Sequence, residues 1–214
     1  MPSFILFDLD GTLVNTLADL SHALNVALSE NGFRTLTEAE TSALVGHSVR
    51  YMCQNATPPE HAGEWQKVER SYATYYKRHC CDRSHPYAGM PEAVRRLKAA
   101  GKRMAVVSNK PHADAVTVVS TLYPRDTFQM VLGRMDRFAI KPAPDAIEFA
   151  LGYFGVPKSE AVYVGDSEVD VEFAKNAGLP CLSVTWGFRT REALLDAGAN
   201  TLIDTPKALL EKLL

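Results

Sequence analysis

From residue 89 onward the chain alternates between short apolar runs and stretches with helical periodicity, and this pattern constrains the fold more than any other feature. Strands that alternate with helices are typical of parallel βαβ units. We therefore expect an α/β fold with a doubly wound, mostly parallel, Rossmann-like sheet, whose first strand is the apolar run at residues 3–8. The other expected strands are residues 102–108, 128–133, 161–166, 181–187 and 201–203.

Residues 15–85 interrupt the alternation and have a helical pattern of their own. Thr16 and Asp19 fit an N-terminal capping box at the start of this segment. We expect a helical cap domain at residues 15–85, inserted into a core domain formed by residues 1–14 and 86–214, with the Pro and Gly of RSHPYAG suited to a hinge. Leucine and aromatic residues recur at helical spacing in the segment: Leu17, Leu20, Leu24, Leu28, Trp65, Val68, Tyr72, Tyr75 and Tyr76.

The charge balance argues against a nucleic-acid or membrane-surface partner, because the formal net charge is only -2. No apolar run approaches the roughly 18 residues of a membrane span, and the start of the chain lacks the pattern of a secretory signal. The 4 cysteines have neither a framework spacing nor a CxxC pair. We expect a cytoplasmic protein with reduced thiols, acting as a monomer or weak homodimer.

Polar groups follow several of the expected strands, at the edge of the sheet where ligands of open α/β proteins bind. One such residue alone is typical of a helix cap, but matched groups at four strand or loop ends are harder to explain by capping. Two carboxylates as close as Asp8 and Asp10 repel each other, and a divalent cation is the simplest group to lie between such acids. The groups expected at this edge are Asp8, Asp10, Ser108, Asn109, Lys110, Lys141, Asp166 and Asp170.

These residues resemble the four motifs of the haloacid dehalogenase-like hydrolases. The stretch from Asp8 to Thr12 is similar to the first motif, DxDGT, and Ser108 and Lys141 are similar to the second and third. Gly165-Asp166-Ser167 with Asp170 is similar to the fourth, GDSxxD. The motifs occur in the family's order and span most of the chain, and VVSNKP, IKPAPDAIEFAL and VTWGF resemble the phosphoglycolate phosphatase branch.

The resemblance implies a phosphatase that hydrolyses a small phosphate ester through an aspartyl-phosphate. Asp8 is then the nucleophile, and Asp10 is the acid for the leaving group and the base for water. The implied cofactor is Mg²⁺, bound by Asp8, the backbone carbonyl of Asp10 and Asp166, with Asp170 as a ligand through water or as a partner of Lys141. The residues expected to bind substrate are Thr12, Ser108, Asn109, Lys141 and, in the cap, Arg50.

Two alternatives remain open from the residues. A phosphomutase of the β-phosphoglucomutase type has the same four motifs but returns the phosphoryl group to a sugar, and the cap decides between the two reactions. A non-catalytic phosphate-binding module is the other alternative, and such a protein is expected to have lost Asp8, Asp10 or Lys141. The resemblance also implies that an acid at position 10 argues against dehalogenase and phosphonate-cleaving activity, since the family members with those activities lack it. The cap residues Gly46, His47 and Arg50 leave the choice of phosphate ester undecided.

Overall fold

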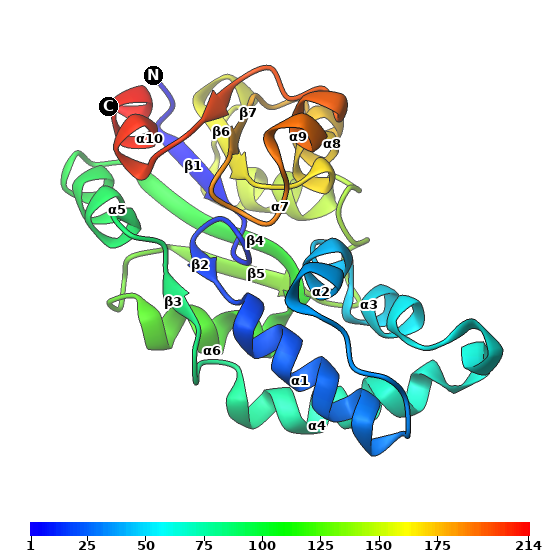
Figure 1. The fold of residues 1–214 in the computed structure, drawn as a ribbon. Coiled ribbons are helices and arrows are strands. Elements are labelled where there is room, and N and C mark those ends of the chain that lie inside the picture. Colours follow the sequence, from blue (N-terminus) through cyan, green and yellow to red (C-terminus); the bar gives the residue numbers. More distant parts are fainter.

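The centre of the molecule is a parallel sheet of six strands in the order β5-β4-β1-β6-β7-β8 (Figure 1). The computed structural model describes all residues from Met1 to Leu214. Every neighbouring pair of strands in this sheet is parallel, which confirms the predicted doubly wound α/β fold. The strands are β1 (Phe4–Phe7), β4 (Arg103–Pro111), β5 (Met130–Arg134), β6 (Ala161–Gly165), β7 (Cys181–Val184) and β8 (Leu202–Ile203).

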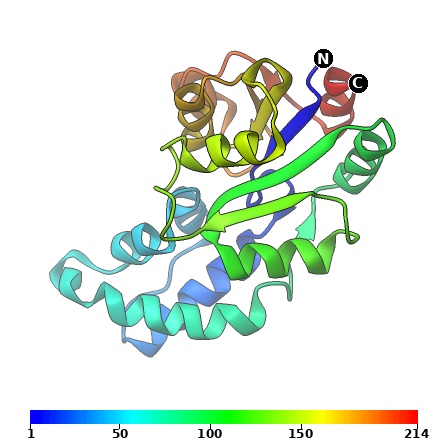
Figure 2. The ribbon, with the colours of Figure 1, turned by 180° about the vertical axis from the view of Figure 1, so that it is seen from behind.

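Helices cover both faces of the sheet, as Figures 1 and 2 show from opposite sides. Strand β1 is buried on both faces, which explains why its sequence FILF is apolar at every position. Ile5 and Phe7 belong to the larger core cluster, together with residues of α6 and α10, whereas Phe4 and Leu6 pack with α7 and α8. The helices of this part are α5 (Met90–Ala99), α6 (His112–Leu122), α7 (Asp145–Phe154), α8 (Glu168–Ala177), α9 (Arg191–Asp196) and α10 (Pro206–Leu213), with a 3₁₀ turn η2 (Lys158–Glu160).

A helical layer lies beside the carboxyl ends of the central strands (Figure 1). The chain enters it through β2 (Val14–Asn15) and leaves it through β3 (His85–Pro86), and these two short strands pair antiparallel. Buried leucines and alanines of the first helix and buried tyrosines of the last belong to the same core cluster as Phe7. The layer consists of α1 (Leu17–Glu30), α2 (Glu38–Leu44), α3 (Val49–Ala56), the 3₁₀ turn η1 (Pro59–Glu64) and α4 (Trp65–His79).

The predicted capping box at the start of α1 is wrong. The Thr16 side chain caps nothing, because its hydroxyl donates to Asp10 Oδ1 at 2.7 Å. The buried carboxylate of Asp19 instead accepts hydrogen bonds from the backbone amides of Arg83 and Ser84 and from the Ser84 hydroxyl. Asp19 therefore fastens the beginning of the helical layer to its end, close to the β2–β3 pair.

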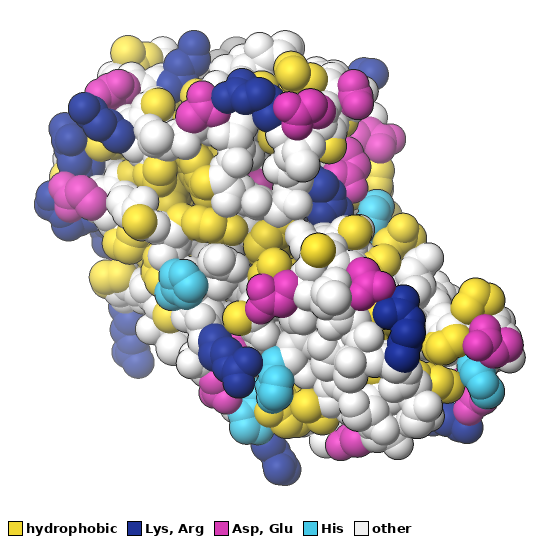
Figure 3. All heavy atoms as spheres, in the orientation of Figure 1, with side chains coloured by type: hydrophobic (Ala, Val, Ile, Leu, Met, Phe, Trp, Pro, Cys, Tyr) yellow, Lys and Arg dark blue, Asp and Glu magenta, His cyan; other side chains and the backbone are white.

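The surface has no large patch of one charge on the face in Figure 3, where acidic and basic side chains are interspersed. This distribution agrees with the formal net charge of -2. No helix combines the length and the apolar character that crossing a membrane requires.

Candidate active site

Asp8 stands directly after β1, at the edge where the helical layer meets the sheet. Its backbone amide donates to Val164 O at 2.9 Å, so the strand pairing with β6 continues to this residue. The chain then turns at Gly11, whose φ of +88° lies in the left-handed region. A Cβ atom at Gly11 would lie 2.2 Å from Asp166 Oδ2. Glycine at position 11 therefore lets the loop pass against the acidic cluster.

Lys141 connects two of the predicted acids. Its Nζ lies 3.0 Å from Asp8 Oδ1 and 2.8 Å from Asp170 Oδ1, and it also donates to the Tyr163 hydroxyl at 3.0 Å. Burial alone would lower the pKa of Lys141, but the charges of Asp170 and Asp8 raise it above its ordinary value. Lys141 is therefore a buried ammonium group that belongs to the acidic cluster.

Asp170 has both carboxylate oxygens engaged by the protein. Oδ1 accepts from Lys141 and lies 3.1 Å from the Tyr163 hydroxyl. Oδ2 accepts from the Asp166 amide, the Ser167 amide and the Ser167 hydroxyl, which also gives α8 a capping box. With these contacts formed, Asp170 is built to hold Lys141 and the start of α8 in place.

Asp166 follows β6 and faces Asp8 across the turn. Its Oδ1 accepts from the Thr12 hydroxyl at 2.9 Å, and its Oδ2 accepts from the Phe188 amide at 2.8 Å. Burial, followed by the charges of Asp170 and Asp8, raises the pKa of Asp166 well above its ordinary value. Thr12 was predicted to bind substrate, but its hydroxyl is taken up by Asp166 in this structure.

The acidic cluster has the chemistry of a divalent-cation site. Oxygen atoms of Asp8, Asp166 and Asp170 lie within 4.8 Å of one another, and all three residues are buried. Asp8 Oδ1 accepts no hydrogen bond, and its contact with the Lys141 ammonium at 3.0 Å is an ion pair. Burial raises the pKa of Asp8 to about 7, opposed by the charge of Lys141 and assisted by the charges of Asp170 and Asp10.

The number of charged groups in the site also indicates a divalent cation. Four carboxylates, counting Asp10, face only two ammonium groups, those of Lys110 and Lys141. When all four are ionised, two negative charges in the buried site lack a counter-charge. An oxygen-ligated divalent cation supplies that charge, so the residues present fit Mg²⁺.

Asp10 lies apart from this cluster and has its own lysine. Lys110 Nζ donates to Asp10 Oδ1 at 3.0 Å and to Oδ2 at 3.3 Å, and the Thr16 hydroxyl also donates to Oδ1. The same Nζ donates to the hydroxyl of Tyr76, a residue of α4, at 2.7 Å. Lys110 therefore pairs with Asp10, and Lys141 pairs with Asp8 and Asp170.

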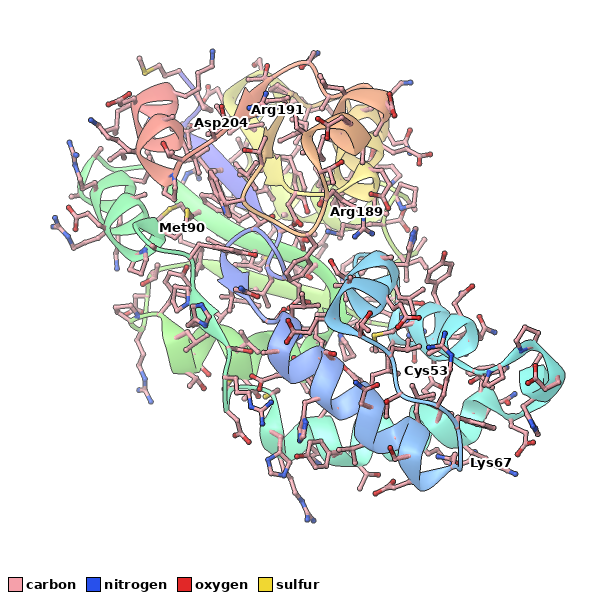
Figure 4. All side chains as sticks on the ribbon, viewed as in Figure 1. Cys53, Lys67, Met90, Arg189, Arg191 and Asp204 are labelled. Atoms are coloured by element: carbon pink, nitrogen blue, oxygen red, sulfur yellow. The ribbon has the colours of Figure 1, made fainter.

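A cavity of about 40 Å³ lies between the strand ends and the helical layer. The Asn109 side chain donates to the backbone oxygen of Gly46 across it, at 3.2 Å. Arg189, on the loop after β7 (Figure 4), donates to the backbone oxygens of Ser42 and Val45. These bonds hold the layer closed over the site. The cavity is lined by Asp8, Asp10, Ser108, Asn109, Lys110 and Pro111 on one side and by Leu20, Leu44, Val45, Gly46, His47, Ser48, Val49, Met52, Tyr72 and Tyr76 on the other.

Of the predicted substrate ligands, Ser108 and Asn109 line the cavity, whereas Thr12 and Lys141 are buried but do not line it. Arg50 lies in the helical layer, on α3. It is exposed, its guanidinium carbon lies 5.4 Å from the centre of the Trp65 ring, and it is not among the cavity-lining residues. Sequence reasoning gave no role to Lys110, although it follows Ser108 and Asn109 at a strand end. It read Tyr76 as helix core, because an aromatic residue at helical spacing carries no sign of a polar partner.

Residues 5–184 match the family model of the haloacid dehalogenase-like hydrolases. The phosphoglycolate phosphatase of Mesorhizobium japonicum is 32% identical over 87% of this chain and 84% of its own length. That of Caulobacter vibrioides is 32% identical over 95% of this chain and 89% of its own. A crystal structure from Lactobacillus delbrueckii subsp. bulgaricus has a TM-score of 0.95 and 32% identity, covering 100% of this chain and 99% of that one.

The chain therefore belongs to the haloacid dehalogenase-like hydrolases. Its relatives place it in the phosphoglycolate phosphatase-like branch, and the prediction of a phosphatase in this family is confirmed.

Proposed function

We propose that the protein is a Mg²⁺-dependent phosphatase that hydrolyses a small, phosphoglycolate-like metabolite through an aspartyl-phosphate on Asp8. The observation that carries the proposal is the state of Asp8: a buried carboxylate at a strand end, whose Oδ1 accepts no hydrogen bond and forms an ion pair with the Lys141 ammonium at 3.0 Å. Such a carboxylate is held in place and remains able to form a new bond. The names of the relatives from Mesorhizobium japonicum and Caulobacter vibrioides support the substrate class.

In the first step, an oxygen of Asp8 forms a bond to phosphorus while the bond from phosphorus to the leaving oxygen breaks. Asp10 gives its proton to that oxygen, so that an alcohol leaves. Lys141 neutralises charge beside Asp8, and the Ser108 hydroxyl, which lines the cavity, is placed to donate to a phosphoryl oxygen. In the second step Asp10 takes a proton from water, the water oxygen bonds to phosphorus, and the Asp8 carboxylate is released with inorganic phosphate.

The metal site in this proposal consists of the carboxylates of Asp8 and Asp166 and the backbone carbonyl of Asp10. A bound Mg²⁺ would neutralise charge on the phosphoryl oxygens. Asp170 contributes by holding Lys141, whose ammonium group lies 2.8 Å from Asp170 Oδ1 in an ion pair. Thr12 contributes by orienting Asp166, to which its hydroxyl donates.

We also propose that the helical layer is a mobile cap, with residues 15–85 as the cap domain and residues 1–14 and 86–214 as the core domain. Hydrogen bonds from Asn109 and Arg189 to backbone oxygens of the layer hold it over the cavity, so substrate enters when the layer moves away from the strand ends. The antiparallel β2–β3 pair carries both connections and is the natural hinge. The 4 cysteines are free, which supports a cytoplasmic location, and we keep a monomer or weak homodimer as the proposed form.

A screen of the purified protein against phosphorylated metabolites with Mg²⁺ tests the proposal. We expect the highest rate of phosphate release with 2-phosphoglycolate, and no measurable turnover for Asp8→Asn, because an amide cannot form the acyl phosphate. Asp136→Asn, at an exposed aspartate outside the site, is the matched control and should keep full activity. Asp8→Asn activity above a few per cent of wild type would remove Asp8 from the nucleophile role.

The same preparation distinguishes phosphatase from phosphomutase by phosphorus NMR. With glucose 1-phosphate and a bisphosphate primer, a phosphatase yields at most free phosphate. Isomerisation that outpaces phosphate release would favour the mutase instead.

A further inference from the structure

Lys110 is a buried cation that the proposed reaction steps do not use. Its side chain is 2% exposed, and it lies at the carboxyl end of β4. Its ammonium group donates to two groups: the Asp10 carboxylate, at 3.0 and 3.3 Å, and the Tyr76 hydroxyl, at 2.7 Å. A buried ammonium group is stable only with such partners, so the fold holds Lys110 and Asp10 together.

Tyr76 brings the helical layer into this arrangement. It belongs to α4, is 1% exposed, and stacks on Tyr72 with ring centres 5.2 Å apart. Lys110 and Asp10 belong to the sheet side of the cavity, whereas both tyrosines belong to the layer side. The Lys110–Tyr76 hydrogen bond therefore crosses the cavity and exists only while α4 is seated over the strand ends.

Asp10 has no partner in the Asp8–Asp166–Asp170 cluster. Its hydrogen-bonded partners are Lys110, from β4, and Thr16, from the segment that enters the helical layer. Lys141 forms ion pairs with Asp8 and Asp170 and does not contact Asp10. Loss of Lys110 would leave Asp10 held by one hydroxyl.

We propose that Lys110 is a positioning residue that holds the Asp10 carboxyl toward the leaving group, and that Tyr76 makes this positioning depend on a closed cap. The proposal deepens the proposed function and rests on it, because it concerns the acid of the first step. Protonation matters most when the leaving oxygen departs as a strongly basic alkoxide, and least when it departs as a stable anion. Lys110 should therefore matter for alkyl phosphates and much less for aryl phosphates.

The test compares kcat/KM on 2-phosphoglycolate, an alkyl phosphate, with kcat/KM on p-nitrophenyl phosphate. General acid catalysis contributes about 10²- to 10⁴-fold. We expect Lys110→Met to lose about 100-fold on the first substrate and less than about 10-fold on the second, so the ratio falls by at least about tenfold. Asp10→Asn should show the same signature. Tyr76→Phe, which removes one hydroxyl and leaves the Lys110–Asp10 pair, should lower the ratio by a smaller factor.

Tyr75→Phe is the matched control, because Tyr75 is the neighbour of Tyr76 on α4, does not line the cavity, and pairs its hydroxyl with His22. It should leave the ratio at the wild-type value. Thermal unfolding of each variant shows whether it is folded. If Lys110→Met does not fold, the substrate ratio of Tyr76→Phe tests the positioning role instead. Equal losses on the two substrates, or an unchanged ratio in Tyr76→Phe, would overturn the positioning role. A wild type that hydrolyses neither substrate would overturn the proposed function itself.

Discussion

Replacing Asp8 with asparagine should stabilise the metal-free fold near and above neutral pH while it abolishes turnover. Burial raises the pKa of the Asp8 carboxyl from 3.8 to about 7, with the charge of Lys141 opposing the rise and those of Asp170 and Asp10 adding to it. The folded protein therefore holds a carboxylate at pH 8 that the unfolded chain ionises more easily. Asparagine has nearly the same shape and no charge, so it removes this cost.

The sign and size follow from the two pKa values. Below pH 3.8 the carboxyl is protonated in both states and costs nothing. Between 3.8 and about 7 only the unfolded chain ionises, so the stability of the folded protein falls as pH rises, and above about 7 the loss is constant. At about 1.4 kcal/mol for each pH unit, the loss approaches about 4 kcal/mol at pH 8 and stays under about 2 kcal/mol at pH 5.

Urea unfolding in EDTA at pH 5 and pH 8 measures the effect. The free energy of unfolding of Asp8→Asn should exceed that of wild type by clearly more at pH 8 than at pH 5. Asp136→Asn, at an exposed site, should follow the wild type at both values. Added Mg²⁺ should stabilise the wild type more than Asp8→Asn and narrow the difference. A variant that is no more stable than wild type at pH 8 would refute the reasoning.

Two further predictions concern the acidic cluster and its metal. Gly11→Ala should abolish activity and lower the free energy of unfolding by more than about 1 kcal/mol, because the residue has a left-handed φ and its Cβ would lie 2.2 Å from Asp166 Oδ2. Gly32→Ala, at a φ of +75° with no atom within 4 Å, has the strain without the clash and should stay active in the same assays. EDTA should abolish phosphate release by the wild type, and Mg²⁺ should restore it. Ca²⁺ should not restore it, because Ca²⁺ takes extra oxygen ligands and could engage both oxygens of Asp8. Full activity in Ca²⁺ would contradict this metal site.

The sheet and the convergence of the acids could be predicted because both follow from local pattern and one topological rule. Parallel strands end at the same edge, so residues after β1 and β6 share that edge, and they meet because the two strands are neighbours in the sheet. The sequence pattern did not reveal which polar groups pair within the site. Thr16 and Asp19 show why: each fits a local capping box, but each has a better partner elsewhere in the fold, Asp10 for Thr16 and the Arg83 and Ser84 amides for Asp19.

The end of β4 shows the same limit more sharply. The predicted strand ends at Ser108, but β4 extends to Pro111, and Ser108, Asn109 and Lys110 are buried in it. Lys110 can be buried because Asp10, 100 positions earlier, and Tyr76, 34 positions earlier, satisfy its ammonium group. No local pattern reports partners at such distances. One inference was nevertheless open from the sequence. The fold brings the carboxylates that follow β1 to the edge where Ser108 and Lys110 lie, so an acidic partner for Lys110 could have been predicted.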